Sequence, residues 1–499
     1  MKASIRLDLD HHVGDIDRRI FSGFVEHLGR AVYEGIFDPA SPLSDANGFR
    51  TDVGKALRKL GMRFMRYPGG NFVSNYDWRD GVGPLAERPV RADFAWKSIE
   101  PNTFGVDEFV NWCRWMDIEP MMAVNLGTLG PREAAELVEY CNFPGGTHWS
   151  DARRQNSSSN PHGINLWCLG NEMDGPWQAG NCTAAEYAAR AQQAGRLMKG
   201  IDSSIELVAC GSTGRYMDTY LEWDRVVLET CWDDVDYISA HRYSRNSQDD
   251  SAWFLAEGVE IDRVLSDYAG LLAYVRGVKR SDKKVYVSFD EWNVWYKDRM
   301  IDGAWSRAPH LLEEIYNLED ALVCAQFLNS FLRHADIVKI ACLAQIVNVI
   351  APILTKPDGM LIQSIYYPFQ LFSQHASGVS LRPIVDGPTH TAGVRGEVPM
   401  LDVSASYDPQ CESISVFVVN RSLTEDIEAQ VSVGGLRAKP DIETIMLTGD
   451  DPKAHNTWER PDVISPNSGT ATRGANGQVF LKVPSLGLTV ARVQLEQRD

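Results

Sequence analysis

Two glutamates, Glu172 and Glu291, each stand two or three residues after the end of a short apolar run, with an asparagine close by in the sequence. A pair of carboxyl groups is sufficient to cleave a glycosidic bond. One, when protonated, donates to the leaving oxygen, while the other, ionised, attacks the anomeric carbon. A glutamate at the end of a strand can also do no more than pair with a neighbouring arginine. The chemistry therefore depends on whether the fold brings the two carboxylates together.

Eight short apolar runs between residues 20 and 375 have the near-continuous hydrophobicity of strands buried on both faces of a parallel sheet. They are 20–26, 62–67, 120–125, 165–169, 205–210, 235–240, 284–289 and 337–343. Between them lie segments with helical spacing of apolar residues, at 51–60, 105–116, 131–142, 183–199, 261–280 and 317–334. This alternation predicts a (β/α)8 TIM barrel over residues 20–375. No GxGxxG or P-loop sequence follows any run, which disfavours nucleotide binding.

The pattern changes after residue 376. Short segments with period-two alternation, at 400–407, 413–419, 428–433, 442–447 and 478–483, are separated by Gly, Pro, Asp and Asn. They predict a C-terminal antiparallel β-sandwich, jelly-roll-like, over residues 376–499. The strand-like stretch 5–9, within the N-terminal segment 1–19, is expected to join this sandwich and to link the two domains.

Polar residues follow most of the predicted barrel strands, at the ends where a (β/α)8 barrel carries its active site. They are Glu26, Asn71, Asn125, Asn171 with Glu172, Tyr243, Glu291 and Gln345. Such a rim suits a ligand rich in hydroxyl groups. No HExxH or paired-histidine spacing is present, so neither a metal nor a cofactor is expected.

The fourth and seventh strands lie roughly opposite each other in a ring of eight, so Glu172 and Glu291 are expected to face one another across the barrel mouth. Asp290 immediately precedes Glu291. Alternation along a strand predicts that its side chain points to the other face. Glu26 has an alternative role as an ion-pair partner of Arg66, and Asn71 as a turn residue with positive φ.

The residues around both glutamates resemble those of a known enzyme family. The segments Trp167-Cys-Leu-Gly-Asn-Glu-Met-Asp-Gly-Pro-Trp177 and Phe289-Asp-Glu-Trp-Asn-Val-Trp-Tyr296 closely resemble the two catalytic signatures of glycoside hydrolase family 51, the intracellular-type α-L-arabinofuranosidases. Segments 23–30, 66–74 and 343–349 are similar as well, and the resemblance extends over nearly the whole chain, sandwich included.

The resemblance implies a retaining, exo-acting α-L-arabinofuranosidase in which Glu172 is the acid/base and Glu291 the nucleophile. The substrate would be arabinofuranosyl-containing oligosaccharides derived from arabinan or arabinoxylan. Residues that would hold the sugar hydroxyls or orient Glu291 are Glu26, Asn71, Asn171, Tyr243 and Gln345, and aromatic residues that would flank the sugar are Trp96 and Trp295.

Two other functions stay open at this point. One is a related enzyme, an endo-β-glucanase or a β-xylosidase-like clan member, that uses the same glutamate pair on β-linked chains. The other is a non-catalytic carbohydrate-binding protein on an inherited barrel. Binding alone needs no opposed pair of carboxyl groups, which argues against the second alternative.

Composition restricts partners and location. The formal net charge of −18 over 499 residues argues against a nucleic-acid partner, because such binding needs a basic surface. The most apolar stretch, 337–354, is interrupted by Lys339, Gln345 and Asn348, so no membrane partner is expected. The nine cysteines form no CxxC pair, and the N-terminus lacks the apolar core of a signal peptide. We expect a cytoplasmic protein with reduced thiols, and the resemblance implies a homo-oligomer, a hexamer.

Overall fold

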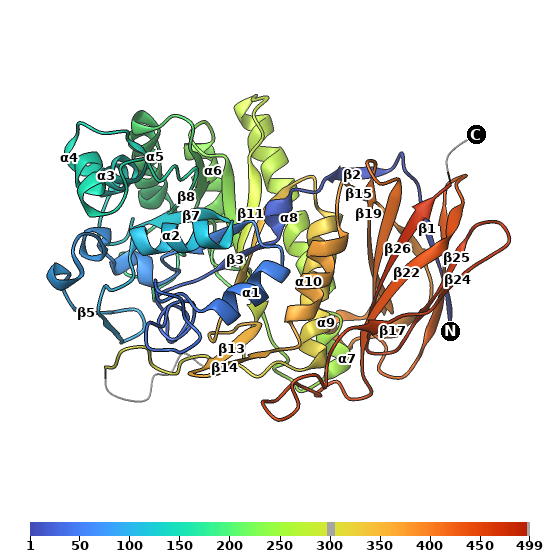
Figure 1. Cartoon of the computed structure of the whole chain (residues 1–499). Coiled ribbons are helices and arrows are strands. Elements are labelled where there is room, and N and C mark those ends of the chain that lie inside the picture. The colour runs from blue at the N-terminus through green and yellow to red at the C-terminus, as the bar shows by residue number, and fades with distance from the viewer. Residues whose placement is uncertain (297–304, 497–499) are drawn as a thin grey trace.

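The computed structural model describes residues 1–296 and 305–496 of the chain. Eight parallel strands close into a barrel whose order around the ring follows the sequence (Figure 1). The strands are β3 (Ser22–Phe24), β4 (Phe64–Tyr67), β7 (Glu119–Val124), β8 (Leu166–Leu169), β9 (Glu206–Ala209), β10 (Tyr237–Ser244), β11 (Tyr286–Val294) and β12 (Val338–Ala344). Each lies within or overlaps one of the eight predicted runs. The predicted (β/α)8 barrel is confirmed.

Helices surround this ring. The segments predicted as helical form α1 (Thr51–Lys59), α2 (Val106–Met116), α3 (Pro131–Asn142), α5 (Ala184–Ile201), α8 (Gly258–Lys279) and α9 (Leu318–Arg333). The structure adds α4 (His148–Asn156), α6 (Glu222–Cys231), α7 (Ser251–Phe254) and α10 (Tyr366–His375). Helix α5 begins as predicted with a capping box, since the Thr183 hydroxyl accepts from the Glu186 amide and Glu186 accepts in return.

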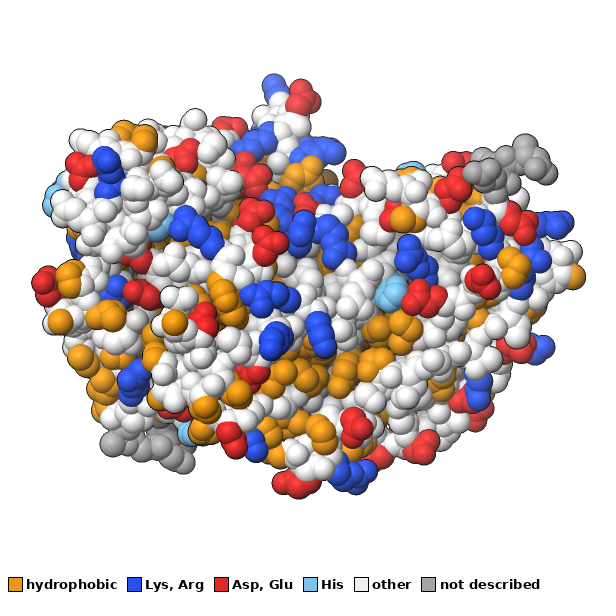
Figure 2. All heavy atoms as spheres, viewed as in Figure 1, with side chains coloured by type: hydrophobic (Ala, Val, Ile, Leu, Met, Phe, Trp, Pro, Cys, Tyr) orange, Lys and Arg blue, Asp and Glu red, His pale blue; other side chains and the backbone are white. Residues whose placement is uncertain are grey.

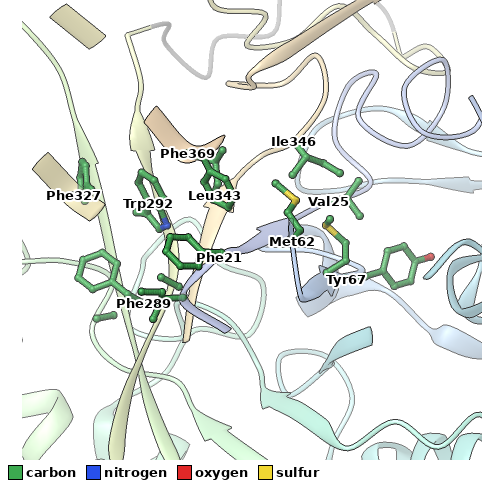
Figure 3. Close-up of a cluster of buried hydrophobic side chains, with 14 of the residues drawn as sticks. Phe21, Val25, Met62, Tyr67, Phe289, Trp292, Phe327, Leu343, Ile346 and Phe369 are labelled. Atoms are coloured by element: carbon green, nitrogen blue, oxygen red, sulfur yellow. The ribbon is translucent and has the colours of Figure 1, made fainter. Parts of the chain in front are cut away.

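The barrel has two apolar layers. Inside the ring, small and unbranched side chains such as Met121, Cys168 and Cys342 pack together. Outside it, aromatic side chains fill the space between strands and helices (Figure 3): Trp292 of β11 packs 5.2 Å from Phe327 of α9, measured between ring centroids. The strands are thus buried on both faces, which explains their continuous hydrophobicity.

The C-terminal region forms two packed sheets, which confirms the predicted sandwich. One sheet contains β16 (Ile384–Asp386), β1 (Lys2–Leu7), β21 (Ile427–Val433), β25 (Val479–Val483) and β24 (Ala471–Arg473), in that order. The other contains β2 (His12–Asp15), β15 (Val379–Leu381), β19 (Leu401–Asp408), β20 (Ser413–Asn420), β26 (Gly487–Leu495), β22 (Ala438–Thr448) and β23 (Asn467–Ser468). Strand β26, which the sequence reading did not select, pairs with both β20 and β22.

The N-terminal segment contributes a strand to each sheet of the sandwich. Strand β1 pairs in parallel with β21, with Ile5 opposite Val431, so the sandwich is not wholly antiparallel. The two strands come from opposite ends of the chain and no hairpin joins them, so nothing forces them to run antiparallel.

Helix α9 lies between the barrel and the sandwich (Figure 1), and its residues from Leu318 to Leu332 are all buried. On the face seen in Figure 2, acidic and basic side chains are interspersed. Among the helices of the described residues, none combines the length and the apolar character needed to span a membrane.

Candidate active site

A pocket at the carboxyl ends of the barrel strands brings together residues far apart in the sequence. Eight of the nine residues selected from the sequence line it: Glu26, Asn71, Trp96, Glu172, Tyr243, Glu291, Trp295 and Gln345. The ninth, Asn171, is buried beside the pocket, where its Oδ1 accepts a hydrogen bond from Nη2 of Arg66 at 2.6 Å.

Glu172 lies just beyond β8, where the chain turns sharply. Gly170 and Glu172 have φ values of 88° and 43°, and this left-handed conformation costs a residue with a Cβ roughly 1 kcal/mol or more. The turn directs the Glu172 carboxyl into the pocket. Nε1 of Trp177 donates to Oε2 at 2.9 Å, and Nδ1 of His241 lies 3.0 Å from Oε1.

Glu291 is held by one donor on each carboxylate oxygen. Nη1 of Arg66 donates to Oε1 at 2.8 Å, and the hydroxyl of Tyr243 donates to Oε2 at 2.8 Å. One oxygen of Glu291 lies within 4.8 Å of one oxygen of Glu172. The two carboxyl groups therefore face each other across a short gap.

Asp290 points into the barrel, so the prediction that it faces the other way is wrong. Its Oδ1 lies 3.1 Å from Nε2 of His241, and its Oδ2 accepts from Sγ of Cys168, a residue of the barrel interior, at 3.8 Å. Phe289 and Trp292, three residues apart, both pack outward against α9.

A β-bulge explains this arrangement. The pairing of β11 with β10 shifts between Ser239 and His241, and its pairing with β12 shifts between Phe289 and Trp292. In each case β11 has one residue more than its neighbour. A bulge places an extra residue in one strand and redirects its side chains. Asp290 and Glu291 consequently both contact groups of the active site.

His241 connects three carboxylates. It lies 3.0 Å from Glu172, 3.1 Å from Asp290 and 3.7 Å from Glu291. Burial alone would lower its pKa, but the negative charges of Glu291, Asp290 and Glu172 raise the pKa of His241 to about 10. The imidazole is therefore doubly protonated at neutral pH. Although Glu172, His241 and Glu291 are close enough to bind a metal ion, an imidazolium has no lone pair to offer one.

Glu26 is buried in the wall of the same pocket. Its Oε1 accepts from the amide of Phe72 at 2.9 Å and from Nε1 of Trp96 at 3.0 Å, and its Oε2 accepts from Nε2 of Gln345 at 3.3 Å. Burial raises the pKa of Glu26 to about 8, and the charge of Glu291 adds to the rise. Glu26 therefore carries a proton at neutral pH and can donate to a ligand hydroxyl.

The remaining predicted residues complete the wall. Tyr243 and Trp295 pack edge to face with ring centroids 5.0 Å apart. Asn71 has φ of −67°, so it does not occupy the positive-φ turn conformation considered for it. Asn125, in contrast, is used to cap the loop after β7, with its Oδ1 accepting from the amide of Gly127.

Arg66 and Trp177 also shape the site, and neither is among the nine residues selected from the sequence. Arg66 connects Glu291 with Asn171, and Trp177 holds Glu172. Both lie inside the motifs quoted for the resemblance, but no periodicity marks a cationic or aromatic side chain as part of a site. The sequence suggests Arg66 only as an ion-pair partner of Glu26, whereas in the structure Arg66 donates its hydrogen bonds to Glu291 and Asn171.

Comparisons with known proteins agree with this geometry. Residues 56–258 match the model of the alpha-L-arabinofuranosidase 1 domain, and residues 290–486 match that of the alpha-L-arabinofuranosidase C-terminal domain. An intracellular exo-alpha-(1->5)-L-arabinofuranosidase of Acetivibrio thermocellus is 46% identical over 475 residues, which are 94% of each chain. An exo-alpha-(1->6)-L-arabinofuranosidase of Bifidobacterium longum is 42% identical over 504 residues, covering 98% of this chain and 96% of that one.

A solved structure extends the likeness to the complete fold. The structure of a family 51 alpha-L-arabinofuranosidase from Bifidobacterium longum superposes with a TM-score of 0.95 at 37% identity, covering 99% of both chains. The chain therefore belongs to the family 51 α-L-arabinofuranosidases.

Proposed function

We propose that this chain releases terminal α-L-arabinofuranosyl residues from oligosaccharides by a retaining, double-displacement mechanism. Exo-acting arabinofuranosidase activity follows from relatives that carry this name at 42–46% identity over almost the whole chain. They favour neither an endo-acting enzyme for β-linked chains nor a protein that only binds sugars. The mechanism and the residue roles are inferred from the site.

In the first step, the Glu291 carboxylate attacks the anomeric carbon and forms an ester bond to it. The bond from that carbon to the leaving oxygen breaks, and protonated Glu172 transfers its proton to this oxygen. Arg66 and Tyr243 each hold one oxygen of Glu291, which orients the nucleophile.

In the second step, the Glu172 carboxylate removes a proton from water as the water oxygen attacks the anomeric carbon. The ester bond to Glu291 breaks as the bond to the water oxygen forms, and the Glu291 carboxylate is regenerated. Nε1 of Trp177 and Nδ1 of His241 each contact one oxygen of Glu172, which holds the carboxyl group in place for both steps.

The single observation that carries the retaining mechanism is the separation of the two carboxyl oxygens, within 4.8 Å. Retaining enzymes place their carboxyl groups about 5–5.5 Å apart, since the nucleophile must reach the sugar directly. NMR of the first-formed product from a 4-nitrophenyl α-L-arabinofuranoside tests this. We expect α-L-arabinose initially, whereas an initial β signal would mean that water attacks directly.

Glu26, Asn71, Asn171, Tyr243 and Gln345 are proposed to hold the sugar hydroxyls, with Trp96 and Trp295 as the aromatic walls. A panel of nitrophenyl glycosides of arabinose, xylose, glucose and galactose measures how closely this wall fits one sugar. We expect arabinofuranoside to be preferred. Because the two relatives are named for different linkages, arabinobioses of both linkages belong in the panel.

Location and assembly are proposed on similar grounds. The relative from Acetivibrio thermocellus is named intracellular, and all nine cysteines of this chain are free, as suits the reducing cytoplasm. We place the chain in the cytoplasm as a homo-oligomer, a hexamer, built from a catalytic domain at 20–375 and a sandwich domain at 376–499 joined by segment 1–19. Light scattering of the purified protein measures the number of copies.

A further inference from the structure

A second groove adjoins the active-site pocket and shares one wall with it. Leu312 lines both. Beyond Leu312, the groove is lined by Arg30, by residues of the segment 310–315, by β13 (Ile353–Lys356) and by Trp458. Strand β13 forms a hairpin with β14 (Gly359–Ile362). The amide of Ile350, itself in the pocket wall, donates to the carbonyl of Leu312 at 2.8 Å. The groove therefore adjoins the pocket that holds Glu172 and Glu291.

Trp458 comes from the sandwich and not from the barrel. It lies in the excursion 449–466, which leaves β22 and reaches the barrel beside the β13–β14 hairpin (Figure 1). The amides of Leu318 and Glu319 donate to carbonyls of this excursion at 2.9 and 3.0 Å. Asn456, buried within it, donates to the carbonyl of Ile362 at 3.1 Å. These bonds hold the excursion against the barrel, although it contributes no residue to the core between the two sandwich sheets.

The groove combines an open aromatic surface with ordered polar groups. Trp458 is 40% exposed, and Nζ of Lys356 lies 4.9 Å from its ring centroid. Glu313 accepts from Nε of Arg30 at 2.7 Å and lies 3.0 Å from Nδ1 of His310. The groove thus places a rigid aromatic ring beside both cationic donors and a carboxylate acceptor. Because charges of both signs are present, this surface suits a neutral ligand with many hydroxyl groups better than a charged one.

We propose that this groove binds the leaving-group side of an oligosaccharide substrate, with the Trp458 indole as the platform for a sugar ring. The inference rests on the proposed function, since it takes the sugar in the pocket to be the terminal one. The rest of the chain must then leave the pocket past its rim. The sugar C–H groups, which are slightly positive, pack on the negative face of the indole, and Lys356, His310 and Glu313 exchange hydrogen bonds with hydroxyl groups.

The experiment compares Trp458→Ala with the wild-type enzyme on two kinds of substrate. A 4-nitrophenyl arabinofuranoside has a short leaving group, whereas linear arabino-oligosaccharides of two to six units extend progressively from the pocket. We expect kcat/KM on the longer oligosaccharides to fall by up to about tenfold, the equivalent of one lost aromatic contact, with no change on the nitrophenyl substrate. Trp458→Phe should recover part of the loss. Tyr274→Ala, an exposed aromatic of α8 outside both pockets, is the matched control and should have no effect.

The outcomes separate this inference from the proposed function. Failure of the wild-type enzyme to hydrolyse the nitrophenyl arabinofuranoside would contradict the proposed function itself. If the wild-type enzyme is active, an equal loss by Trp458→Ala on both substrates, or no loss on either, overturns the groove assignment. A change in the number of copies measured by light scattering would show that Trp458 lies between copies of the chain, and would overturn it as well.

Discussion

Two clusters of buried or partly buried charged side chains differ in the ratio of carboxyl groups to cations. The mouth cluster, at the active site, holds four carboxyl groups against two cations: Glu26, Glu172, Asp290 and Glu291 with Arg66 and His241. The interface cluster, where α8 and α9 meet the sandwich, holds two carboxylates and two arginines: Asp262, Asp402, Arg333 and Arg421. Both are well hydrogen-bonded, yet only one has more carboxyl groups than cations to neutralise them.

The imbalance determines which groups keep their protons. At the interface cluster, Arg333 and the neighbouring His334, whose Nε2 lies 3.4 Å from Asp262, more than offset the cost of burial and lower the pKa of Asp262 to about 2. In the mouth cluster, the pKa of Glu26 rises to about 8 and that of His241 to about 10. A balanced cluster connects two domains, whereas an acid-rich one holds protons near neutral pH, which acid/base chemistry requires.

The largest effect is expected at the nucleophile. Glu291→Gln is nearly isosteric but cannot form the ester, so kcat should fall by at least about 10⁴-fold even on activated nitrophenyl substrates. Thermal stability should hold or rise, because one carboxylate leaves an acid-rich cluster. Mass spectrometry of wild-type enzyme treated with a slow fluoro-arabinoside should find the label on the peptide that contains Glu291. Label on another peptide would contradict the assignment.

The second effect concerns the acid/base. Glu172→Ala should lower kcat/KM by about 10²–10⁴-fold on substrates with poor leaving groups, and far less on activated phenols, which depart without a proton. Loss of the base also slows the second step. Azide needs no base and should therefore restore turnover, with an arabinosyl azide as product. Equal losses across leaving groups, with no azide product, would contradict this role.

The third effect is on stability and tests the other side of the comparison. Asp402 accepts from Nη2 of Arg421 at 2.9 Å and from Nδ2 of Asn329 at 2.7 Å, and lies 3.1 Å from Arg333. Asp402→Ala leaves the buried Arg421 and the partly buried Arg333 without this partner, which should cost about 3–5 kcal/mol in the free energy of unfolding. Denaturant melts measure the loss. Activity per folded molecule should stay within about twofold, and a selective loss of kcat would mean that the interface cluster also serves catalysis.

The interface cluster also predicts that the free energy of unfolding falls in acid. Because the folded-state pKa of Asp262, about 2, lies below its unfolded value, its contribution is present above about pH 4 and is lost as the pH falls through 2.

Features that depend on local sequence could be predicted, whereas those that depend on how separate strands and helices come together could not. The barrel strands were recognisable because burial on both faces demands uninterrupted apolar runs, and Glu172 and Glu291 because they end two such runs. Strand β26 was not predicted because it is central and nearly all of its residues are buried. Taken together, Leu488, Val490 and Arg492 therefore differ little in hydrophobicity from the residues between them, and the strand shows no clear period of two. The Asp290 prediction was wrong because a bulge is set by the pairing of three strands, which no local period in β11 reveals. The interface cluster combines residues from α8, α9, β19 and the segment after β20, and only the fold brings them together.

The smallest expected effect is the most specific test of that bulge. Asp290 is fully buried and contacts Nε2 of His241, so Asp290→Asn removes a negative charge and keeps an oxygen that can accept the same hydrogen bond. The pKa of His241 should then fall from about 10, because Glu172 and Glu291 alone must oppose its burial. Since this pKa lies above the unfolded value, the stabilisation it represents is complete below about pH 6.5 and is lost as the pH rises through 10. In the variant, the loss should occur at lower pH, and the alkaline limb of kcat/KM should move toward neutral by about one pH unit or more. NMR titration of the His241 ring nitrogens should show the same shift.

Asp402→Asn makes the same chemical change in the interface cluster and should leave the pH profile unmoved. If Asp290→Asn also leaves it unmoved, the bulge serves only to aim Glu291, and the excess of acid at the mouth has no part in keeping His241 protonated.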